Sequence, residues 1–223
     1  MGTYTDSENT RSRILAVAGE TFARRGFQAA TIRDICSAAE VNLASVNYYF
    51  GDKQQLYVAA LEHARDTQQS KFPFVEFLTS GEPADRLRNF IGVLVQRLGV
   101  GMPTSGRWEI QLLVRELMRP GPAGREIVED FFRPYFQLLM DILQQLAPRP
   151  LSRSECLRLG FSVIGQCLFY RVAEPIIAML VDLESQPAVL NTSEVVEHIT
   201  RFTLSGIGAI GQGCRHSDEP LTT

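Results

Sequence analysis

The sequence lacks the features that mark several large classes of protein. Its cysteines, Cys36, Cys156, Cys167 and Cys214, are far apart; no CxxC pair occurs, and no Cys/His pair has zinc-ligand spacing. We therefore expect free thiols in a reducing compartment and no metal site. Apolar runs end well before the ~18 residues that a transmembrane helix needs, and residues 1–13 have no apolar signal-peptide centre. These absences predict a cytoplasmic protein that does not enter a membrane.

Catalytic motifs are also missing. The sequence contains no Walker A, G-x-S-x-G or H-E-x-x-H pattern. Gly206–Gly211 spells G-x-G-x-x-G, but it follows a helical pattern instead of a strand and lacks an acidic partner ~20 residues further on. Glu194–His198 reads E-x-x-E-H and is interpreted as a solvated helix face, and Cys167 has no histidine nearby in sequence. We therefore predict no enzymatic activity and no cofactor.

The charge balance permits a nucleic-acid partner without requiring one. The 223 residues include 22 basic and 25 acidic side chains, so the net charge is −3 and the chain is not polybasic. Residues 10–57 carry six basic and four acidic side chains, a local excess of positive charge. With 45% hydrophobic and 21% charged residues, the composition is that of a globular protein of one or two domains.

Helical periodicity dominates the chain, and no run alternates apolar and polar residues as a half-buried strand does. The fold class is therefore predicted to be all-α. In chain order the predicted helices cover residues 10–25, 32–39, 43–49, a stretch that starts at Asp52 or Lys53, then 83–98, 106–118, 124–146, 152–181 and 193–212. The pattern indicates a compact N-terminal unit of three helices and a larger helical bundle, joined by the fourth helix.

Local signals fix several helix ends. Gly26 is expected to stop the first helix as a C-terminal cap, and Thr31 to cap the second, with Asp34 completing a capping box. Ser152–Glu155 forms another capping box, and Pro175 should kink or end the helix that follows. That helix is apolar almost all round, so we expect it to be buried on most sides. Apolar stripes are predicted at Ile14, Leu15, Ala18 and Phe22 in the first helix, and at Leu56, Tyr57, Ala60, Leu61 and Ala64 in the fourth.

The second and third predicted helices carry the functional signal. They are short and separated by a turn at Glu40–Asn42, the arrangement of a helix-turn-helix. A helix can enter the major groove of DNA only if its exposed face is slim and can hydrogen-bond. The third helix offers such a face through small polar side chains at Asn42, Ser45 and Asn47.

The remaining side chains of this segment divide between the core and its far end. Tyr48, Tyr49 and Lys53 lie where hydroxyl groups and an ammonium group can hold phosphates. The apolar side chains expected to point inward are Val41, Val46 and Phe50, packed against Phe22, Ile32 and Ile35.

Thr31–Lys53, TIRDICSAAEVNLASVNYYFGDK, resembles the DNA-binding signature of TetR-family repressors, and the preceding ILAVAGETFARRGFQAAT resembles that family's first helix. The resemblance is strong over residues 10–60. Further along, MRPGPA at Met118–Ala123 and GQCLFYR at Gly165–Arg171 are similar to the CecR-like subgroup. The resemblance implies a homodimeric bacterial transcriptional repressor that binds a palindromic operator in double-stranded DNA.

The resemblance also implies which parts of this chain do what. It assigns DNA binding to residues 1–56, and effector binding and dimerisation to residues 57–223. The residues implied for the major groove are Leu43, Ala44, Ser45 and Asn47. Those implied for phosphate contacts are Thr31, Asn42, Tyr48, Tyr49 and Lys53. An effector that prefers the state not bound to DNA would then release the operator.

The C-terminal bundle holds the candidate effector residues. A cavity with a few polar groups among apolar ones suits a small lipophilic or aromatic effector. The candidates are Trp108, Gln111, Arg115, Phe132, Tyr135, Phe136, Cys167 and Tyr170. Small residues near the C-terminus favour close helix packing, which we interpret as a twofold dimer contact, with a contact inside one chain as the alternative. They are Ser205, Gly206, Gly208, Ala209 and Gly213.

Two departures from the family pattern keep an alternative open. Glu40 stands where the family usually has glycine, and a positive φ there would cost ~1 kcal/mol or more. Leu43 and Ala44 replace frequent polar or glycine residues and could meet thymine methyl groups instead of hydrogen-bonding base edges. The alternative is a helical small-molecule-binding or interaction protein that has lost DNA binding.

Overall fold

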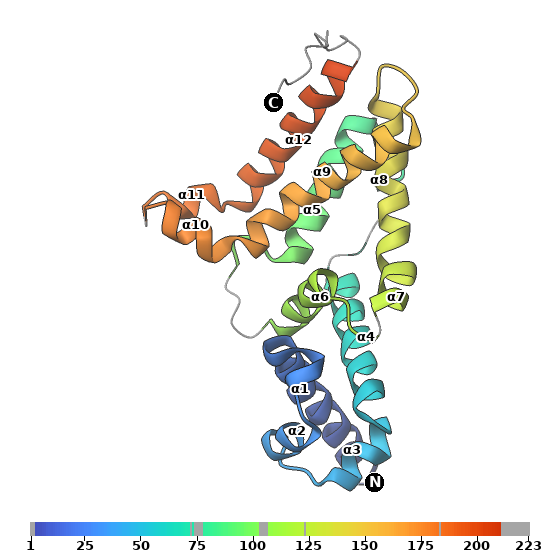
Figure 1. Cartoon of the computed structure of the whole chain (residues 1–223), viewed down its shortest axis with the longest axis vertical. Helices are drawn as coiled ribbons and strands as arrows, with labels where there is room; N and C mark the ends of the chain where they lie inside the picture. The colour runs from blue at the N-terminus through green and yellow to red at the C-terminus, as the bar shows by residue number, and fades with distance from the viewer. Residues whose placement is uncertain are drawn as a thin grey trace, which may run out of the picture. The chain divides into compact units, whose positions relative to one another are not determined.

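The computed structural model describes residues 3–71, 73, 78–102, 107–122, 124–182 and 184–210, without the side chains of 3–7, 130 and 131. All regular structure in these residues is helical, which confirms the all-α prediction (Figure 1). The chain divides into two compact units. Unit 1 comprises the described residues of Met1–Phe74 and Arg97–Pro134, and unit 2 those of Val75–Gln96 and Tyr135–Thr223. Residues beyond the predicted limit of 56 thus pack with the N-terminal helices.

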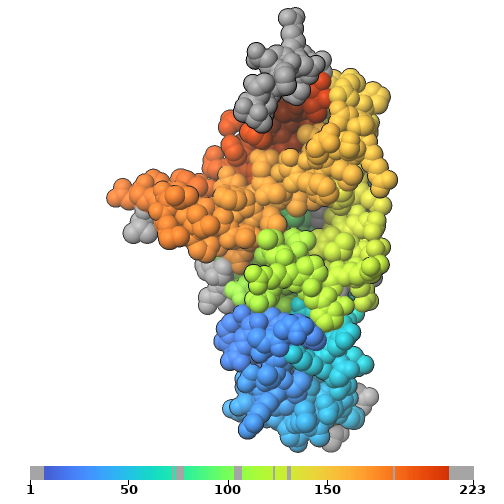
Figure 2. All heavy atoms as spheres, viewed as in Figure 1, coloured from blue at the N-terminus to red at the C-terminus, as the bar shows by residue number. Residues whose placement is uncertain are grey.

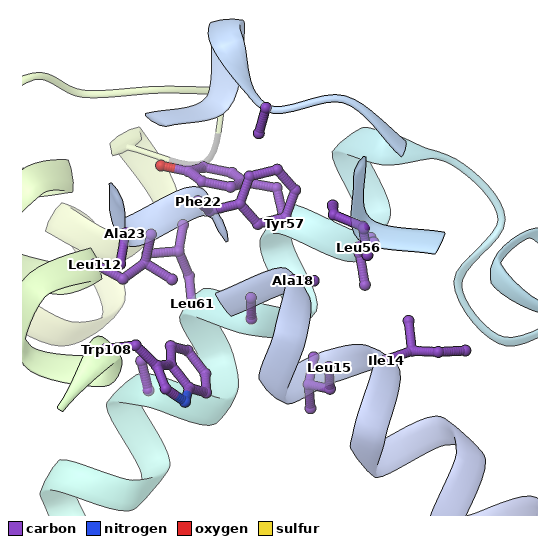
Figure 3. Packing of buried hydrophobic residues seen from close by; sticks show 14 of the residues in the cluster. Ile14, Leu15, Ala18, Phe22, Ala23, Leu56, Tyr57, Leu61, Trp108 and Leu112 are labelled. Carbon is purple, nitrogen blue, oxygen red and sulfur yellow. The ribbon is translucent and has the colours of Figure 1, made fainter. Parts of the chain in front are cut away.

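Unit 1 is built on α1 and α4, with α6 packed against both. Its helices are α1 (Thr3–Ala29), α2 (Ile32–Ala38), α3 (Leu43–Phe50), α4 (Lys53–Lys71), α6 (Trp108–Met118) and α7 (Gly124–Ile127), followed by the π-helical segment η2 (Val128–Phe132). The predicted stripes of α1 and α4 are buried in one core. Figure 3 shows Leu112 of α6 beside Ala23 and Leu61, and Trp108 of α6 at another part of the same core.

Unit 2 consists of α5 (Pro83–Leu98, of which the last two residues belong to unit 1), α8 (Arg133–Leu146), α9 (Arg153–Val172), α10 (Glu174–Leu180), α11 (Gln186–Val189) and α12 (Thr192–Ile210). α9 packs against α12. On α9, Gly160 lets α8 approach closely, because a Cβ there would lie 2.2 Å from Met140 Cε. α10 and α11, in orange, project from the rest of unit 2 (Figure 2).

Most predicted helix ends are confirmed. Thr31 is the N-cap of α2, and Ser152 and Glu155 form the capping box of α9. Gly26 breaks the first helix with a φ of 78°, although helical hydrogen bonding resumes as far as Ala29. The helix itself begins at Thr3, earlier than predicted, because its first residues lack the apolar periodicity on which the prediction relied.

One predicted helix is wrong in its continuity, and another is bent near Pro175 as predicted. The one at 124–146 is interrupted by η2, where the Arg133 N–H donates to the carbonyl of Val128, a wider turn that apolar spacing does not reveal. The one at 152–181 divides at Ala173 into α9 and α10, bent by 71°, with Pro175 in the first turn of α10, as its rigid φ predicted. Within the described residues no single helix is long and apolar enough to cross a membrane; α9 and α10 reach that length and composition only together, across their bend.

The expectation that α9 is buried on most sides is wrong for the single chain. Val163 and Cys167 are buried, but Phe161 is 62% exposed and Phe169 56% exposed. The sequence could not separate burial within one chain from burial against another. Nor does any described helix cover the small residues of α12, because a Cβ on Gly206 or Gly208 would meet nothing within 4 Å. Gly213 of that set lies outside the described residues.

Candidate nucleic-acid interface

Local hydrogen bonds fix the helix-turn-helix formed by α2 and α3. Thr31 Oγ1 accepts from the Asp34 N–H at 3.1 Å and starts α2. Of the predicted capping box, only the hydrogen bond accepted by Thr31 is formed. The Asp34 carboxylate instead pairs with Arg25 of α1 at 2.6 Å, which links α2 to α1. Asn42 is the N-cap of α3, with its Oδ1 accepting from the Ser45 N–H at 2.8 Å. Both helices are therefore held in place before any ligand arrives.

α3 separates its buried side chains from its exposed ones. Val46 and Phe50 are buried in the core of unit 1, and Val41 packs against it half-buried, as predicted. Leu43 is 56% exposed and Tyr48 is 82% exposed. The other exposed residues of the predicted DNA-binding set are Thr31, Asn42, Ala44 and Asn47. Ser45, Tyr49 and Lys53 are half-buried, and Tyr49 packs against the core. All of the predicted set except Thr31, which starts α2, thus lies on α3 or next to its ends.

Two cations lie on aromatic rings next to α3. The Lys53 ammonium sits 4.6 Å from the centre of the Phe27 ring and donates to the Gln28 carbonyl at 3.4 Å. The Arg11 guanidinium lies 5.2 Å from the centre of the Phe50 ring. Such contacts orient a charge while leaving it near the surface. Arg11 is exposed and was not among the predicted DNA-binding residues, because nothing in its local sequence distinguishes it from the other arginines of α1.

Glu40 adopts the strained backbone that its departure from the family pattern suggested. Its φ is 53°, the one positive value at a non-glycine residue among those described. Its side chain is exposed in the turn before α3, so its negative charge lies beside the candidate interface.

We expect Glu40→Gly to raise the free energy of unfolding by about 1 kcal/mol, because glycine adopts a positive φ without steric cost. Urea denaturation followed by circular dichroism measures this change. The matched control is Ser37→Gly in the regular helix α2, where glycine should lower stability by about 0.5–1 kcal/mol. A loss of stability in Glu40→Gly would show that the turn carries no strain.

Arg115 of α6 holds the end of α1. Its guanidinium donates to the carbonyls of Ala23 and Arg24 at 3.4 Å and of Arg25 at 3.2 Å. These carbonyls form the last turn before the break at Gly26, where a cation is favourable. Glycine is favoured at Gly26 by its φ of 78°, and a Cβ there would lie 2.6 Å from Arg115 Nη2, so the guanidinium would have to shift. The predicted effector residue Arg115 therefore has a structural role in unit 1.

Glu116, the next residue of α6, is a buried carboxylate only 2% exposed. One oxygen accepts from the Tyr57 hydroxyl of α4, and the other accepts from the Gly121 N–H at 2.8 Å. Burial and the adjacent carboxylate raise the pKa of Tyr57, so its hydroxyl keeps its proton and remains a donor. α6 is thus bound to α1 through Arg115 and to α4 through Glu116.

Tyr57→Phe should lower the free energy of unfolding by about 1–3 kcal/mol, because it removes a hydrogen bond to a buried carboxylate. The measurement is urea denaturation at neutral pH, with Tyr48→Phe as the exposed control. Equal stability of the two variants would contradict this role of Tyr57.

The predicted effector residues fall in both units. Unit 1 holds Trp108, Gln111, Arg115 and Phe132, and unit 2 holds Tyr135, Phe136, Cys167 and Tyr170. Trp108 is buried in the core cluster. In unit 2 the Phe136 ring stacks on Phe161 with 5.3 Å between centroids. Cys167 is fully buried in the core, and burial raises the pKa of its thiol to about 12, so the thiol keeps its proton.

Tyr170 lines an open groove of about 290 Å³ on unit 2. The other lining residues come from α11 and α12: Ala188, Val189, Glu194, Val195, Glu197, His198 and Arg201. The E-x-x-E-H sequence, interpreted as a solvated face, contributes exposed Glu194, Glu197 and His198. Glu197 also pairs with Arg88 of α5 at 3.2 Å.

An all-helical chain that presents one short, exposed helix from a helix-turn-helix has the architecture of a DNA-binding transcriptional regulator. Residues 14–60 match the family described as bacterial regulatory proteins, tetR family. Residues 83–207, more than half of the chain, match the family described as HTH-type transcriptional dual regulator CecR, C-terminal domain. This chain therefore belongs to the TetR family of transcriptional regulators and is of the CecR-like type.

Individual proteins agree with this assignment. The chain is 24% identical to the HTH-type transcriptional dual regulator CecR of Shigella flexneri over 191 residues, 77% of this chain and 80% of that protein. It is 37% identical over 57 residues to the HTH-type transcriptional repressor NicS of Pseudomonas putida, of which the match spans only 27%. The crystal structure of AibR in complex with isovaleryl coenzyme A and operator DNA shares the fold, with a TM-score of 0.63 and 17% identity over 86% of this chain and 97% of AibR.

Proposed function

We propose that this chain is a ligand-responsive repressor that binds a palindromic operator as a homodimer in the cytoplasm. Residues 1–56 read the DNA, and residues 57–223 bind the effector and form the dimer. The observation that carries the proposal is the exposed face of α3, presented by a helix whose other face is buried in the core of unit 1. Relatives such as NicS are named repressors, which supports repression of transcription instead of activation.

The exposed face of α3 suits the major groove. Leu43, Ala44, Ser45 and Asn47 would face base edges, with half-sites about one helical turn apart. The groups assigned to phosphates are donors, as phosphates require. They are the hydroxyls of Thr31, Tyr48 and Tyr49, the Asn42 amide and the Lys53 ammonium. The Lys53 ammonium is already oriented by its contact with the Phe27 ring.

The exposed apolar side chains of α9, α10 and α12 support dimer formation through unit 2. They are Phe161, Phe169 and Val172 on α9, Ile176, Met179 and Leu180 on α10, and Phe202 on α12. We call them the apolar set. Monomeric proteins rarely leave so many large apolar groups in water. Open space beside Gly165, Gly206 and Gly208 lets the helices of a second protomer approach closely.

We propose that the effector acts through α4 and α6. α6 lies in the same compact unit as α2 and α3, and it is bound to α1 by Arg115 and to α4 by Glu116. A small lipophilic or aromatic ligand that displaces α6 would therefore disturb both helices that support α3. Of the predicted effector residues, those on α6 are Trp108, Gln111 and Arg115, which such a ligand would contact or displace. The ligand must bind the non-DNA state more tightly for release to follow.

Glu40 favours the alternative of a helical binding protein without DNA-binding activity. Its exposed carboxylate in the turn before α3 would repel a phosphate backbone.

One experiment separates the two functions. The purified dimer is mixed with sheared genomic DNA at physiological salt, and bound fragments are sequenced, with and without a small-molecule extract. The proposal predicts enrichment of a palindromic site of ~16–24 base pairs and its release by some extract. A folded dimer that enriches no fragment above random DNA would rule out the repressor.

A further inference from the structure

The reading face of α3 has an unusual chemical composition for a DNA-binding helix. Its eight residues, Leu43–Phe50, include no arginine or lysine. Leu43 and Ala44 present exposed apolar side chains at its beginning, and Asn47 presents an exposed amide one turn later. Apart from the hydroxyls of Ser45 and Tyr48, this helix therefore offers bases apolar contacts and an amide, without a guanidinium or ammonium group.

The polar groups at the start of α3 are committed to its cap. Asn42 Oδ1 accepts both the Ser45 N–H at 2.8 Å and the Ser45 hydroxyl at 3.0 Å. The Ser45 hydroxyl proton is thus directed to Asn42 Oδ1, and Asn42 offers only its amide N–H groups to a ligand. Those donors suit a phosphate. Tyr48 is exposed as well, but the proposed function assigns its hydroxyl to a phosphate, which leaves the Asn47 amide as the donor and acceptor for bases.

The four base pairs differ in what they offer to such a face. Guanine presents two acceptors, O6 and N7, which Arg or Lys satisfies. Adenine presents a donor at N6 beside an acceptor at N7, which an amide such as that of Asn47 satisfies with two hydrogen bonds. Thymine adds a C5-methyl group, which packs against apolar side chains such as Leu43 and Ala44.

We infer that the bases read by α3 are A·T pairs: an adenine bound by Asn47 and thymine methyl groups packed against Leu43 and Ala44. The inference rests on the proposed function and specifies its DNA target. It concerns only the base pairs under α3, because exposed arginines such as Arg33 on α2 lie outside that helix.

The test selects duplexes from a random-sequence library with the purified full-length protein and with Asn47→Arg. Positions whose selected base changes between the two proteins are those under residue 47. We expect adenine there for the natural protein and guanine for Asn47→Arg. Asn47→Gln keeps the amide and should therefore select the same adenine as the natural protein. It is the variant to compare if Asn47→Arg does not fold. Guanine or cytosine selected by the natural protein at these positions would overturn the inference.

A second measurement tests the methyl contacts. Replacing thymines of the selected half-site by uracil removes only the methyl groups and should weaken binding about fourfold for each buried methyl. In the Leu43→Ser variant, replacing the thymine that Leu43 contacts by uracil should no longer weaken binding. Uracil in the flanking sequence is the control. An unchanged affinity with uracil throughout the half-site contradicts the inference, whereas failure to select any sequence contradicts the proposed function instead.

Discussion

Trp108→Ala is expected to lower the free energy of unfolding by about 3–5 kcal/mol, the usual cost of removing a large aromatic side chain from a core. The Trp108 ring lies against Gly19 of α1 and stacks on His63 of α4, with 5.6 Å between ring centroids. Its neighbours in the core are shown in Figure 3. Urea denaturation by circular dichroism measures the change, and His63→Ala, which alters the exposed partner, is the control.

A double-mutant cycle identifies the cause of this effect. A Cβ on Gly19 would lie 2.2 Å from Trp108 Cζ3, so Gly19→Ala should itself cost about 1–3 kcal/mol by overpacking. When Trp108 is replaced by leucine, the same change at Gly19 should cost little, which gives a coupling of about 0.5–3 kcal/mol. Additive effects would show that Gly19 and Trp108 do not form the joint between α1 and α6.

Phe202→Glu, alone or with Phe169→Glu, is expected to turn the proposed dimer into a monomer. A charge placed in a buried apolar interface should raise the dimer dissociation constant about 30- to 1000-fold, as for other central interface residues. Both side chains are largely exposed in the single chain, so the protomer should keep its stability. Sedimentation measures the dimer, and urea denaturation measures the protomer.

The control for this prediction is Gln144→Glu on α8, which adds the same charge at an exposed position outside the apolar set. The monomeric variants should also lose operator binding at concentrations where the natural protein binds, because one reading helix contacts only a half-site. A Phe202→Glu, Phe169→Glu protein that remains a dimer would show that protomers associate through another surface.

The parts of the fold that local chemistry decides could be predicted from the sequence. Thr31 caps α2, Ser152 and Glu155 cap α9, and Pro175 accompanies the bend into α10, because each acts within a few residues of itself. The apolar stripe of α4 was predicted for the same reason, since helical spacing alone determines which side chains share a face.

Other features depend on contacts between distant residues. The pairing of Trp108 with Gly19 joins helices far apart in sequence, so the position of α6 against α1 could not be inferred, and Trp108 was assigned to an effector site. The burial of Glu116 could have been suspected from the sequence, because helical spacing places it one turn after Leu112 on the apolar face of α6. The exposed phenylalanines of α9 were misjudged because an apolar side chain indicates burial without indicating the partner.

The most direct test of DNA reading by α3 compares natural protein and Asn47→Ala on a captured operator and on random DNA. Asn47 is exposed, so its loss should leave the fold and nonspecific phosphate binding unchanged. Fluorescence anisotropy at fixed salt should show the ratio of operator to random affinity falling about 5- to 150-fold. An unchanged ratio would mean that α3 does not read the operator through Asn47, and it would contradict the proposed recognition of DNA by this helix.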